Sequence, residues 1–302
     1  MKKVLVTGAN GQLGSDIVKE LEAQHFEVLP KTHHQFDIID YSRVDQILRE
    51  QKPDVLINTA AFHHVDQCEA DPEKARQVNA DAPANLARIC QGLGIRFIHF
   101  STDYVFDGKK GTPYLESDAA DPLNVYGKSK REGELAILKE NPYALVLRIS
   151  AIYGQHPCRA KNGLNFIRLM LKLADEQGSV KVVDDEFVSP TSTLSIARMI
   201  PILIENKISG IIHITSEGSC SWHEFAKTIF ELTDRKHIMV QKAGSGDFPA
   251  KTPRPAYSVL ENAVLKEHGL PLMPHWRESL EEYLGALADE ESPGEVRAMP
   301  ER

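Results

Sequence analysis

The segment "VLVTGANGQLG" at residues 4–14 decides the fold that this sequence predicts. The apolar run at 2–7 is typical of a buried strand, and the residues after it have the spacing of one face of a helix. Between the two, Gly8, Gly11 and Gly14 form a G-x-x-G-x-x-G pattern, which lets the backbone turn tightly and approach a pyrophosphate at the helix N-terminus. A glycine triplet at the first strand–helix junction predicts a dinucleotide site. The residues expected to form it are Gly8, Asn10, Gly11, Gln12, Leu13 and Gly14.

The first half of the chain alternates apolar runs with amphipathic helical patterns. The further apolar runs lie at 26–30, 54–61, 95–102 and 144–150, and the helical patterns at 43–51, at 72–93 and from Tyr126 onward. This alternation predicts parallel strand pairing and a doubly wound, Rossmann-like α/β sheet with helices on both faces. The expected units are a dinucleotide-binding domain at 1–150, a smaller substrate-binding lobe at 151–288 and a disordered tail at 289–302. Later segments, such as 210–215, are expected to return to the sheet.

The composition is that of an ordinary soluble protein, since 42% of the 302 residues are hydrophobic and 26% are charged. The net charge of −8 argues against a general nucleic-acid binder, which needs a basic excess. No apolar run is long enough to span a membrane, and the first residues become glycine-rich too early for a signal peptide. The four cysteines are scattered without a CxxC pair, which predicts a reduced, cytoplasmic protein. The adjacent histidine pairs at 33–34 and 63–64 do not predict a metal site, because neighbouring side chains rarely point at one ion.

The end of the second strand carries the residues that distinguish the two nicotinamide dinucleotides. An acidic residue there accepts from a free ribose 2′-hydroxyl, whereas a basic residue accommodates a 2′-phosphate. This chain has "LPKTHH" at 29–34, with Lys31 and two histidines but no acid. The pattern favours NADPH and leaves NADH as the alternative. Asp37, in "FDIID", and its neighbour Ile38 are expected on the adenine side.

A tyrosine and two lysines occur in "NVYGKSKREGE" at 124–134. If a helix begins at Tyr126, Lys130 at i+4 shares its face, whereas Lys128 at i+2 points away. We therefore predict that Lys130 is the partner of the tyrosine and that Lys128 is a solvated surface charge. Thr102, at the end of the fourth strand, supplies a hydroxyl upstream of this pair.

These residue types suit the reduction of a ketone. The reaction needs a hydride from a nicotinamide and a proton for the developing alkoxide. A free tyrosine, with a pKa near ~10, holds its proton firmly, and a nearby ammonium lowers that pKa. Lys130 can also donate to the cofactor ribose. The hydroxyl of Thr102 can orient the carbonyl between Tyr126 and the nicotinamide.

With these motifs the sequence resembles the extended short-chain dehydrogenase/reductases and, more narrowly, the dTDP-4-dehydrorhamnose reductase family. The resemblance extends to about residue 285 and includes "VTGANGQLG", "NTAAFHHVDQCEADPEKARQVNADAPANLA", "STDYVFDG", "PLNVYGKSKREGE", "VSPTST" and "RPAYSVLEN". It implies that Thr102, Tyr126 and Lys130 are catalytic. It places Ala60, Ala61 and Asn79 near the cofactor, and it places around the substrate His63, Val105, Ala151, Arg254 and Ser258.

The resemblance implies an NADPH-dependent reductase of a nucleotide-linked 4-keto-6-deoxy sugar, with dTDP-4-dehydrorhamnose as the leading substrate and dTDP-rhamnose as the product. The chain departs from the family pattern where the sugar binds. His63 replaces a threonine, and Ala151 replaces a tryptophan. An extra loop at 155–161 carries Arg159 and Lys161. These changes leave open which 4-keto sugar is bound and with which stereochemistry at C4 it is reduced, and the resemblance leaves a homodimer open as well.

Two other functions fit parts of this pattern. A sugar-nucleotide 4,6-dehydratase uses Thr-Asp-Glu, because elimination needs a further carboxylate, whereas this chain has Thr-Asp-Tyr at 102–104. A regulatory subunit of methionine adenosyltransferase resembles the same family and binds NADP without needing turnover. Retention of Thr102, Tyr126 and Lys130 favours the enzyme, while Ala151 favours the regulatory subunit.

Overall fold

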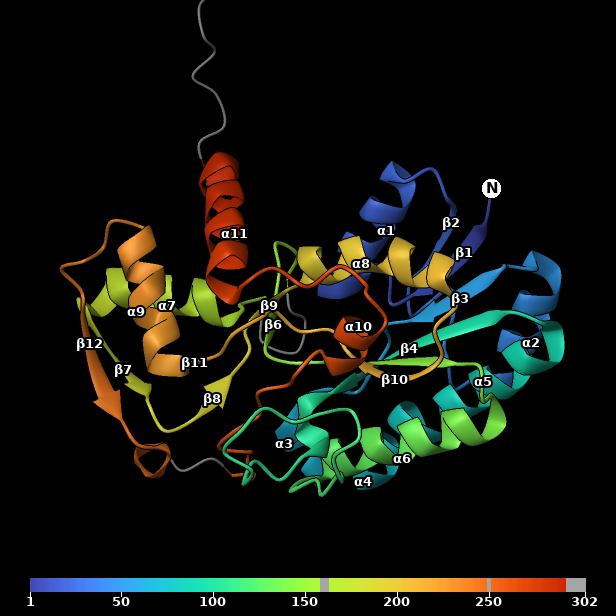
Figure 1. Cartoon of the computed structure of the whole chain (residues 1–302), viewed down its shortest axis with the longest axis horizontal. Helices are drawn as coiled ribbons and strands as arrows, with labels where there is room; N and C mark the ends of the chain where they lie inside the picture. Colours follow the sequence, from blue (N-terminus) through green and yellow to red (C-terminus); the bar gives the residue numbers. More distant parts are fainter. Residues whose placement is uncertain (158–162, 249–250, 292–302) are drawn as a thin grey trace, which may run out of the picture.

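The computed structural model describes residues 1–157, 163–248 and 251–291 (Figure 1). Within these residues, six strands form the central sheet in the order β10-β5-β4-β3-β1-β2, and every neighbouring pair is parallel. The strands are β1 Lys3–Thr7, β2 Glu27–Lys31, β3 Val55–Asn58, β4 Arg96–Thr102, β5 Leu145–Ile149 and β10 Gly210–His213. The predicted doubly wound α/β sheet is confirmed, and the strand expected at 210–215 joins it at one edge.

Helices cover both faces of this sheet (Figure 1). One face carries α1 and α8, and the other carries α2, α5 and α6. Their bounds are α1 Gln12–Ala23, α2 Tyr41–Gln51, α5 Ala82–Leu93, α6 Val125–Glu140 and α8 Thr193–Asn206. Two short helices, α3 Val65–Ala70 and α4 Pro72–Arg76, precede α5.

The two-layer core follows from the alternation of side chains along each strand. On β1, Val4 and Val6 face the α1–α8 side, while Leu5 faces the α2–α5–α6 side, and all three are fully buried. Complete burial of one such aliphatic side chain contributes about 1.5–3 kcal/mol. Because both faces are apolar, the strands read as continuous hydrophobic runs in the sequence.

The helical region expected at 72–93 is interrupted by a π-helical turn, η1 Gln77–Asp81. The amide of Ala82 donates to the carbonyl of Gln77, five residues earlier. Pro83 follows and has no N–H with which to continue an α-helical bond to the carbonyl of Asn79. That carbonyl instead faces α6, where a Cβ placed on Gly133 would lie 2.2 Å from it.

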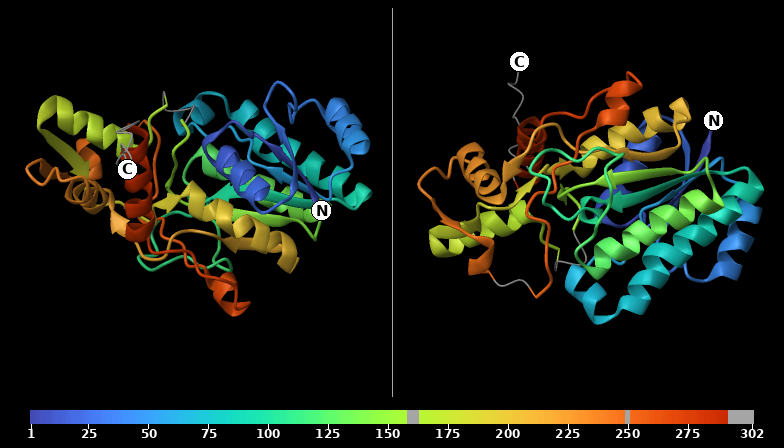
Figure 2. Two further views of the ribbon diagram at one scale, coloured as in Figure 1. Left: turned by 90° about the horizontal axis from the view of Figure 1, so that it is seen from above. Right: turned by 60° about the horizontal axis from the view of Figure 1, so that its bottom comes forward.

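A second hydrophobic cluster lies beside the sheet (Figures 1 and 2). It packs Tyr153, Phe225 and Trp276 among three helices and a parallel strand pair. These elements are α7 Phe166–Gln177, α9 Trp222–Leu232, α11 Trp276–Glu291, β7 Ser179–Val183 and β12 Met239–Ala243. The remaining short elements are β6 Ile152–Tyr153, β8 Phe187–Val188, β9 Thr191–Ser192, β11 Cys220–Ser221, α10 Ala263–Glu267 and the 3₁₀ turns η2 Asp103–Val105 and η4 Ser245–Asp247.

The C-terminal helix ends later than the sequence predicted. The tail was expected to begin at residue 289, but α11 continues to Glu291. The helix extends past its last buried contact, Leu287, because no glycine or proline interrupts it there. Residues 292–302, the rest of the expected tail, lie outside the described part of the chain.

Candidate active site

The glycine turn between β1 and α1 has the shape of a cradle for an anion. Gly8 has a positive φ of +64°, and the amide of Gly11 donates to its carbonyl over 2.8 Å. A Cβ on Gly14 would lie 2.3 Å from that same carbonyl, so only glycine lets α1 begin so close to the turn. Gly11 caps α1 without a side-chain hydrogen bond, which leaves the first amides of the helix directed at the turn. The cradle therefore fits the pyrophosphate of a dinucleotide.

The other residues predicted for this turn lie in three different environments. Asn10 is exposed, whereas the side chain of Leu13 belongs to the hydrophobic core. Leu13 could therefore face a bound pyrophosphate through its backbone amide. The side-chain nitrogen Nε2 of Gln12 donates to the carbonyls of Gly154 and His156, over 3.4 and 3.2 Å, and so ties a distant segment to the start of α1.

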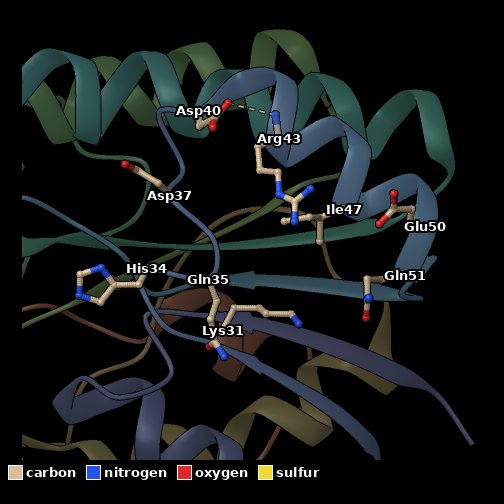
Figure 3. Close-up of a pocket in the computed structure, with 9 residues that line it drawn as sticks. All are labelled: Lys31, His34, Gln35, Asp37, Asp40, Arg43, Ile47, Glu50 and Gln51. Carbon is tan, nitrogen blue, oxygen red and sulfur yellow. Dashed lines mark hydrogen bonds between the residues drawn. The ribbon is translucent and has the colours of Figure 1, made fainter.

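A pocket of about 380 Å³ lies beside the edge strand β2 (Figure 3). Its lining residues are Lys31, His34, Gln35, Asp37, Asp40, Arg43, Ile47, Glu50 and Gln51. Arg43 adds a second cation to the predicted Lys31, and the sequence pattern did not single it out. Its amide is held by the N-cap Asp40, whose Oδ1 accepts over 3.1 Å. Asp37 accepts from the amide of Ile39 over 3.2 Å, while Ile38 is buried in the core.

The helix α6 begins where the tyrosine–lysine motif predicted it. Asn124 caps the helix by accepting from the amide of Gly127 over 2.8 Å. A Cβ on Gly127 would lie 2.1 Å from the carbonyl of Tyr104, so this glycine allows α6 to pack closely against η2. Lys130 is buried and Lys128 is exposed, so the two lysines lie in different environments.

The ammonium-bearing end of Lys130 is directed into the sheet. Its Nζ donates to the carbonyl of Phe100 over 2.5 Å and lies 3.1 Å from Nε2 of His99. Burial lowers the pKa of Lys130 to about 8. His99 was not among the residues predicted for the site. A histidine inside an otherwise apolar strand is the signal by which it could have been found.

Tyr126 lies one helical turn before Lys130 and meets Thr102 at the end of β4. A side-chain hydrogen bond joins Tyr126 to Thr102. Burial raises the pKa of Tyr126 above its ordinary value, and the bond to Thr102 offsets only part of that rise. The expected lowering by Lys130 is therefore wrong for the protein without ligands, because burial outweighs it and Nζ of Lys130 faces Phe100 and His99.

A buried carboxylate lies directly behind Thr102. Asp103 accepts from the hydroxyls of Thr102 and Ser150, each over 3.0 Å, and is also hydrogen-bonded by the side chain of Ser258. Burial raises the pKa of Asp103 while these three hydroxyls lower it, and the net result is a raised pKa. Ser258, predicted on the substrate side, is thus linked through Asp103 to Thr102 at the end of β4.

Asn79 holds the loop that follows β3. Its side chain donates to the carbonyl of Phe62 and accepts from the amide of the same residue, over 2.8 and 2.9 Å. Its amide nitrogen also lies 3.1 Å from the hydroxyl of Ser129 on α6. The predicted cofactor residues Ala60 and Ala61 are partly buried in the loop that Asn79 fixes.

The residues predicted around the substrate are not equally accessible. Arg254 and His63 are exposed, and the positive charge of Arg254 lowers the pKa of Tyr104 against the larger effect of burial. Val105 is fully buried with its side chain in a small hydrophobic cluster. Ala151 has a positive φ of +43° and is partly buried. Arg159 and Lys161 lie outside the described residues.

The described parts of the chain, 1–157, 163–248 and 251–291, contain neither a cluster of metal ligands nor a membrane-spanning helix. Among these residues no group of three or more histidine, cysteine, aspartate or glutamate side chains is arranged to hold a metal ion. No helix in the same ranges has the length and hydropathy needed to cross a membrane.

Comparison with known proteins identifies clear relatives. Residues 1–288 match the family of RmlD substrate binding domains. The spore coat polysaccharide biosynthesis protein SpsK of Bacillus subtilis is 39% identical over 94% of this chain and 97% of its own length. A dTDP-4-dehydrorhamnose reductase from Clostridium acetobutylicum superposes with a TM-score of 0.90 at 39% identity, over 95% of this chain and 99% of that one. The enzyme of the same name from Bacillus anthracis, crystallised with NADP, gives 0.89 at 35% identity, over 94% and 99%.

Proposed function

The chain belongs to the RmlD family of dTDP-4-dehydrorhamnose reductases, and from this premise we propose that it is an NADPH-dependent reductase of a 4-keto-6-deoxy sugar linked to a nucleoside diphosphate. The observation that carries the proposal is that Tyr126 contacts Thr102 at the carboxyl end of β4, while Lys130, one turn later on α6, binds the carbonyl of Phe100 on the same strand. The glycine cradle opens at the same edge of the sheet, because β1 and β4 are parallel to one another through β3.

NADPH would supply the hydride, and residues of this chain would hold its phosphates. The cradle of Gly8, Gly11 and Gly14 fits the pyrophosphate. Lys31 and Arg43 bring two cations to the pocket beside β2, where a 2′-phosphate would be recognised. NADH lacks that phosphate, so it would bind in the same cradle without the added attraction of Lys31 and Arg43.

Tyr126 is the proposed proton donor. Its raised pKa keeps the phenol protonated, and the hydroxyl of Thr102 lies within hydrogen-bonding reach of it. A ketone oxygen placed here would accept from the phenol of Tyr126, and from the hydroxyl of Thr102 once that hydroxyl turns away from Asp103. The proton of Tyr126 would pass to the oxygen as it becomes an alkoxide. Asp103 fixes the hydroxyl of Thr102 from behind.

The leading substrate is dTDP-4-dehydrorhamnose, which would be reduced to dTDP-rhamnose. Arg254 is exposed and suits the diphosphate of the nucleotide-sugar. Where the family pattern has a tryptophan beside the sugar, this chain has Ala151 and therefore no indole. Because the φ of Ala151 is positive, a tryptophan would be strained there. Kinetics of the wild type and of Ala151→Trp on dTDP-4-dehydrorhamnose and its nearest analogues would measure how much this position contributes to substrate choice.

We further propose that segment 151–288 forms most of the substrate lobe, that the protein acts in the cytoplasm and that it forms a homodimer. The hydrophobic cluster of α7, α9 and α11 supports the first of these, because it lies beside the sheet and not within it. Analytical ultracentrifugation at several protein concentrations tests the homodimer, and a single monomeric species at all of them would exclude it.

The alternative function is that of an NADP-binding regulatory subunit, which the alanine at position 151 favours. One assay separates the two functions. Oxidation of NADPH is followed at its absorbance band with a panel of 4-keto-6-deoxy sugar nucleotides. The reductase is expected to consume NADPH in proportion to the sugar added, whereas NADPH binding without consumption on any of the sugars would favour the regulatory subunit.

A further inference from the structure

A line of buried polar side chains leads from the end of β1 to Lys130. The hydroxyl of Thr7 donates to Oδ1 of Asn58 over 2.6 Å, and Nδ2 of Asn58 lies 3.0 Å from Nδ1 of His99. Nε2 of His99 then lies 3.1 Å from Nζ of Lys130. All four side chains are at most 2% exposed, so water does not compete for these bonds. Each proton in the line must therefore be placed by its protein neighbours.

The orientation of the Asn58 amide is fixed by a backbone group. The amide of Ala60 donates to Oδ1 of Asn58 over 3.2 Å. A backbone N–H cannot accept, so turning the side-chain amide over would bring two donors face to face. The hydroxyl of Thr7 can donate to Oδ1 without conflict. Nδ2 of Asn58 consequently faces His99 and donates to Nδ1.

The tautomer of His99 follows from this bond. Because Nδ1 accepts from Asn58, the proton of the neutral imidazole is on Nε2. A doubly protonated ring would direct its Nδ1–H at the N–H of Asn58. Burial also lowers the pKa of His99 well below its ordinary value, which keeps the ring neutral.

The Nε2–H of His99 is directed at Nζ of Lys130, and an ammonium has no lone pair to accept it. We propose that His99 is a positioning residue that donates to Lys130 and favours its neutral amine form over the ammonium in the protein without ligands. The amine in turn donates to the carbonyl of Phe100. The line of bonds then runs in one direction from Asn58 through His99 and Lys130 to the carbonyl of Phe100, and His99 and Lys130 each accept one bond and donate one.

The charges around Lys130 do not oppose this arrangement strongly. Glu134, one turn further along α6, favours the ammonium, but its carboxylate is paired with Arg148 and Arg131. Cys68 on α3 would favour the ammonium only as a thiolate, and burial raises the pKa of its thiol to about 11. Tyr126 stays protonated because its pKa is raised. His99 and the carbonyl of Phe100 are therefore the two hydrogen-bond partners of Nζ from outside α6, and of these only His99 can donate.

The proposal changes where the transferable proton resides. With Lys130 neutral, the ligand-free site carries that proton on the phenol of Tyr126 and not on the lysine. When Tyr126 gives its proton to an alkoxide, the phenolate left behind and a proton taken from solvent by Lys130 would balance each other's charge. This consequence rests on the proposed reductase function, whereas the proton state of free Lys130 does not.

The test is a pH titration of the ligand-free protein by NMR, with lysine labelled by ¹³C at Cε and histidine by ¹⁵N. The Lys130 signal is identified by its absence in Lys130→Arg, and the His99 signals by their absence in His99→Phe. In the wild type we expect the Nε2–H tautomer at His99 and a Lys130 pKa of about 8 or lower. In His99→Phe the donor to Nζ is removed, and the Lys130 pKa is expected to rise by at least about one pH unit.

Asn58→Asp provides a second variant with the opposite hydrogen-bonding demand, because its carboxylate would accept from Nδ1–H and leave Nε2 as an acceptor for an ammonium. The Lys130 pKa should rise in this variant too, and it should not change in His237→Phe, an exposed histidine elsewhere. A Lys130 pKa that does not rise in His99→Phe, or a proton on Nδ1 of His99, would overturn the proposal. Because no cofactor or substrate is present, this result is independent of whether the protein proves to be a reductase.

Discussion

Glu134 on α6 and Arg148 on β5 form a doubly hydrogen-bonded ion pair inside the protein. Nε and Nη2 of Arg148 donate to the two carboxylate oxygens over 2.8 and 2.7 Å, and the side chains are 1% and 0% exposed. Glu134 lies one helical turn after Lys130 and two turns after Tyr126 on α6. The pair therefore fixes the face of α6 that carries Tyr126 and Lys130 against the sheet.

Arg148→Met should destabilise the protein by up to about 3–5 kcal/mol, because it leaves the buried Glu134 carboxylate with Arg131 as its remaining charged partner. The free energy of unfolding is measured by urea denaturation. In the double variant Glu134→Leu/Arg148→Met the loss should be smaller than in Arg148→Met alone. A double variant less stable than the single one would mean that the pair itself contributes more than the isolated charge costs.

Stability should fall in acid partly through Glu134. Burial raises the pKa of this carboxyl, but the bonds and charge of Arg148 outweigh burial, so the net pKa is lowered from 4.5. A group with a depressed folded-state pKa stabilises the fold above its unfolded pKa, and the stabilisation is lost as the pH falls through the folded value. The difference in unfolding free energy between wild type and Glu134→Gln should therefore be constant near neutral pH and shrink below pH 4.5. A difference that grows with acidification would contradict this sign.

Tyr126→Phe should reduce turnover by about 10²–10⁴-fold, since only the proton donor is removed. The affinity for NADPH, measured by fluorescence titration, should stay within a few-fold of the wild type. Tyr143→Phe is the matched control, because Tyr143 is 72% exposed and should leave both quantities unchanged. Substantial residual activity in Tyr126→Phe would show that another group donates the proton.

Lys130→Ala and Lys128→Ala should differ sharply. Lys130 is buried beside Phe100 and His99, so its loss should lower both kcat and the affinity for NADPH. Lys128 is exposed on the other side of α6, and its loss should change neither. Steady-state kinetics and cofactor titration on both variants provide the measurement, and equal effects would refute the division between the two lysines.

NADPH should be preferred over NADH, because Lys31 and Arg43 both line the pocket beside β2 (Figure 3). Lys31→Asp should narrow or reverse the ratio of kcat/KM for the two cofactors, since a carboxylate repels a 2′-phosphate. Lys52→Asp is a control for the change of charge alone, because Lys52 follows the far end of α2 and does not line the pocket. A wild-type preference for NADH would exclude this use of the pocket.

The helices and strands, and the face of α6 on which Lys130 lies, could be predicted from the sequence because both depend on local spacing. The strands were recognisable because both faces of the sheet are covered, and Tyr126 and Lys130 are four residues apart on one helix. The buried partners were beyond such patterns. His99 meets a lysine 31 residues later, and Asp103 meets the hydroxyl of Ser150 47 residues later, so only the folded sheet brings them together.

The pKa of Tyr126 was mispredicted for a related reason. Residue types and spacing gave the neighbouring ammonium, but burial depends on everything packed around the ring, including Tyr104, which meets it edge to face at 5.9 Å. The π turn at 77–81 was also hidden, because a helical pattern of apolar residues does not distinguish four-residue from five-residue bonding.

That π turn makes the length of this stretch as important as its chemistry. Each residue added to or removed from an α-helix rotates everything beyond it by about 100°. The extra residue in η1 sets the rotation at which Asn79 reaches Phe62, and at which its carbonyl fits against Gly133. Single substitutions among the exposed positions of 77–81 keep that rotation, whereas a one-residue insertion or deletion changes it at once. In homologous chains whose Asn79 binds Phe62 in this way, segment 77–81 should therefore vary much more in residue type than in number of residues.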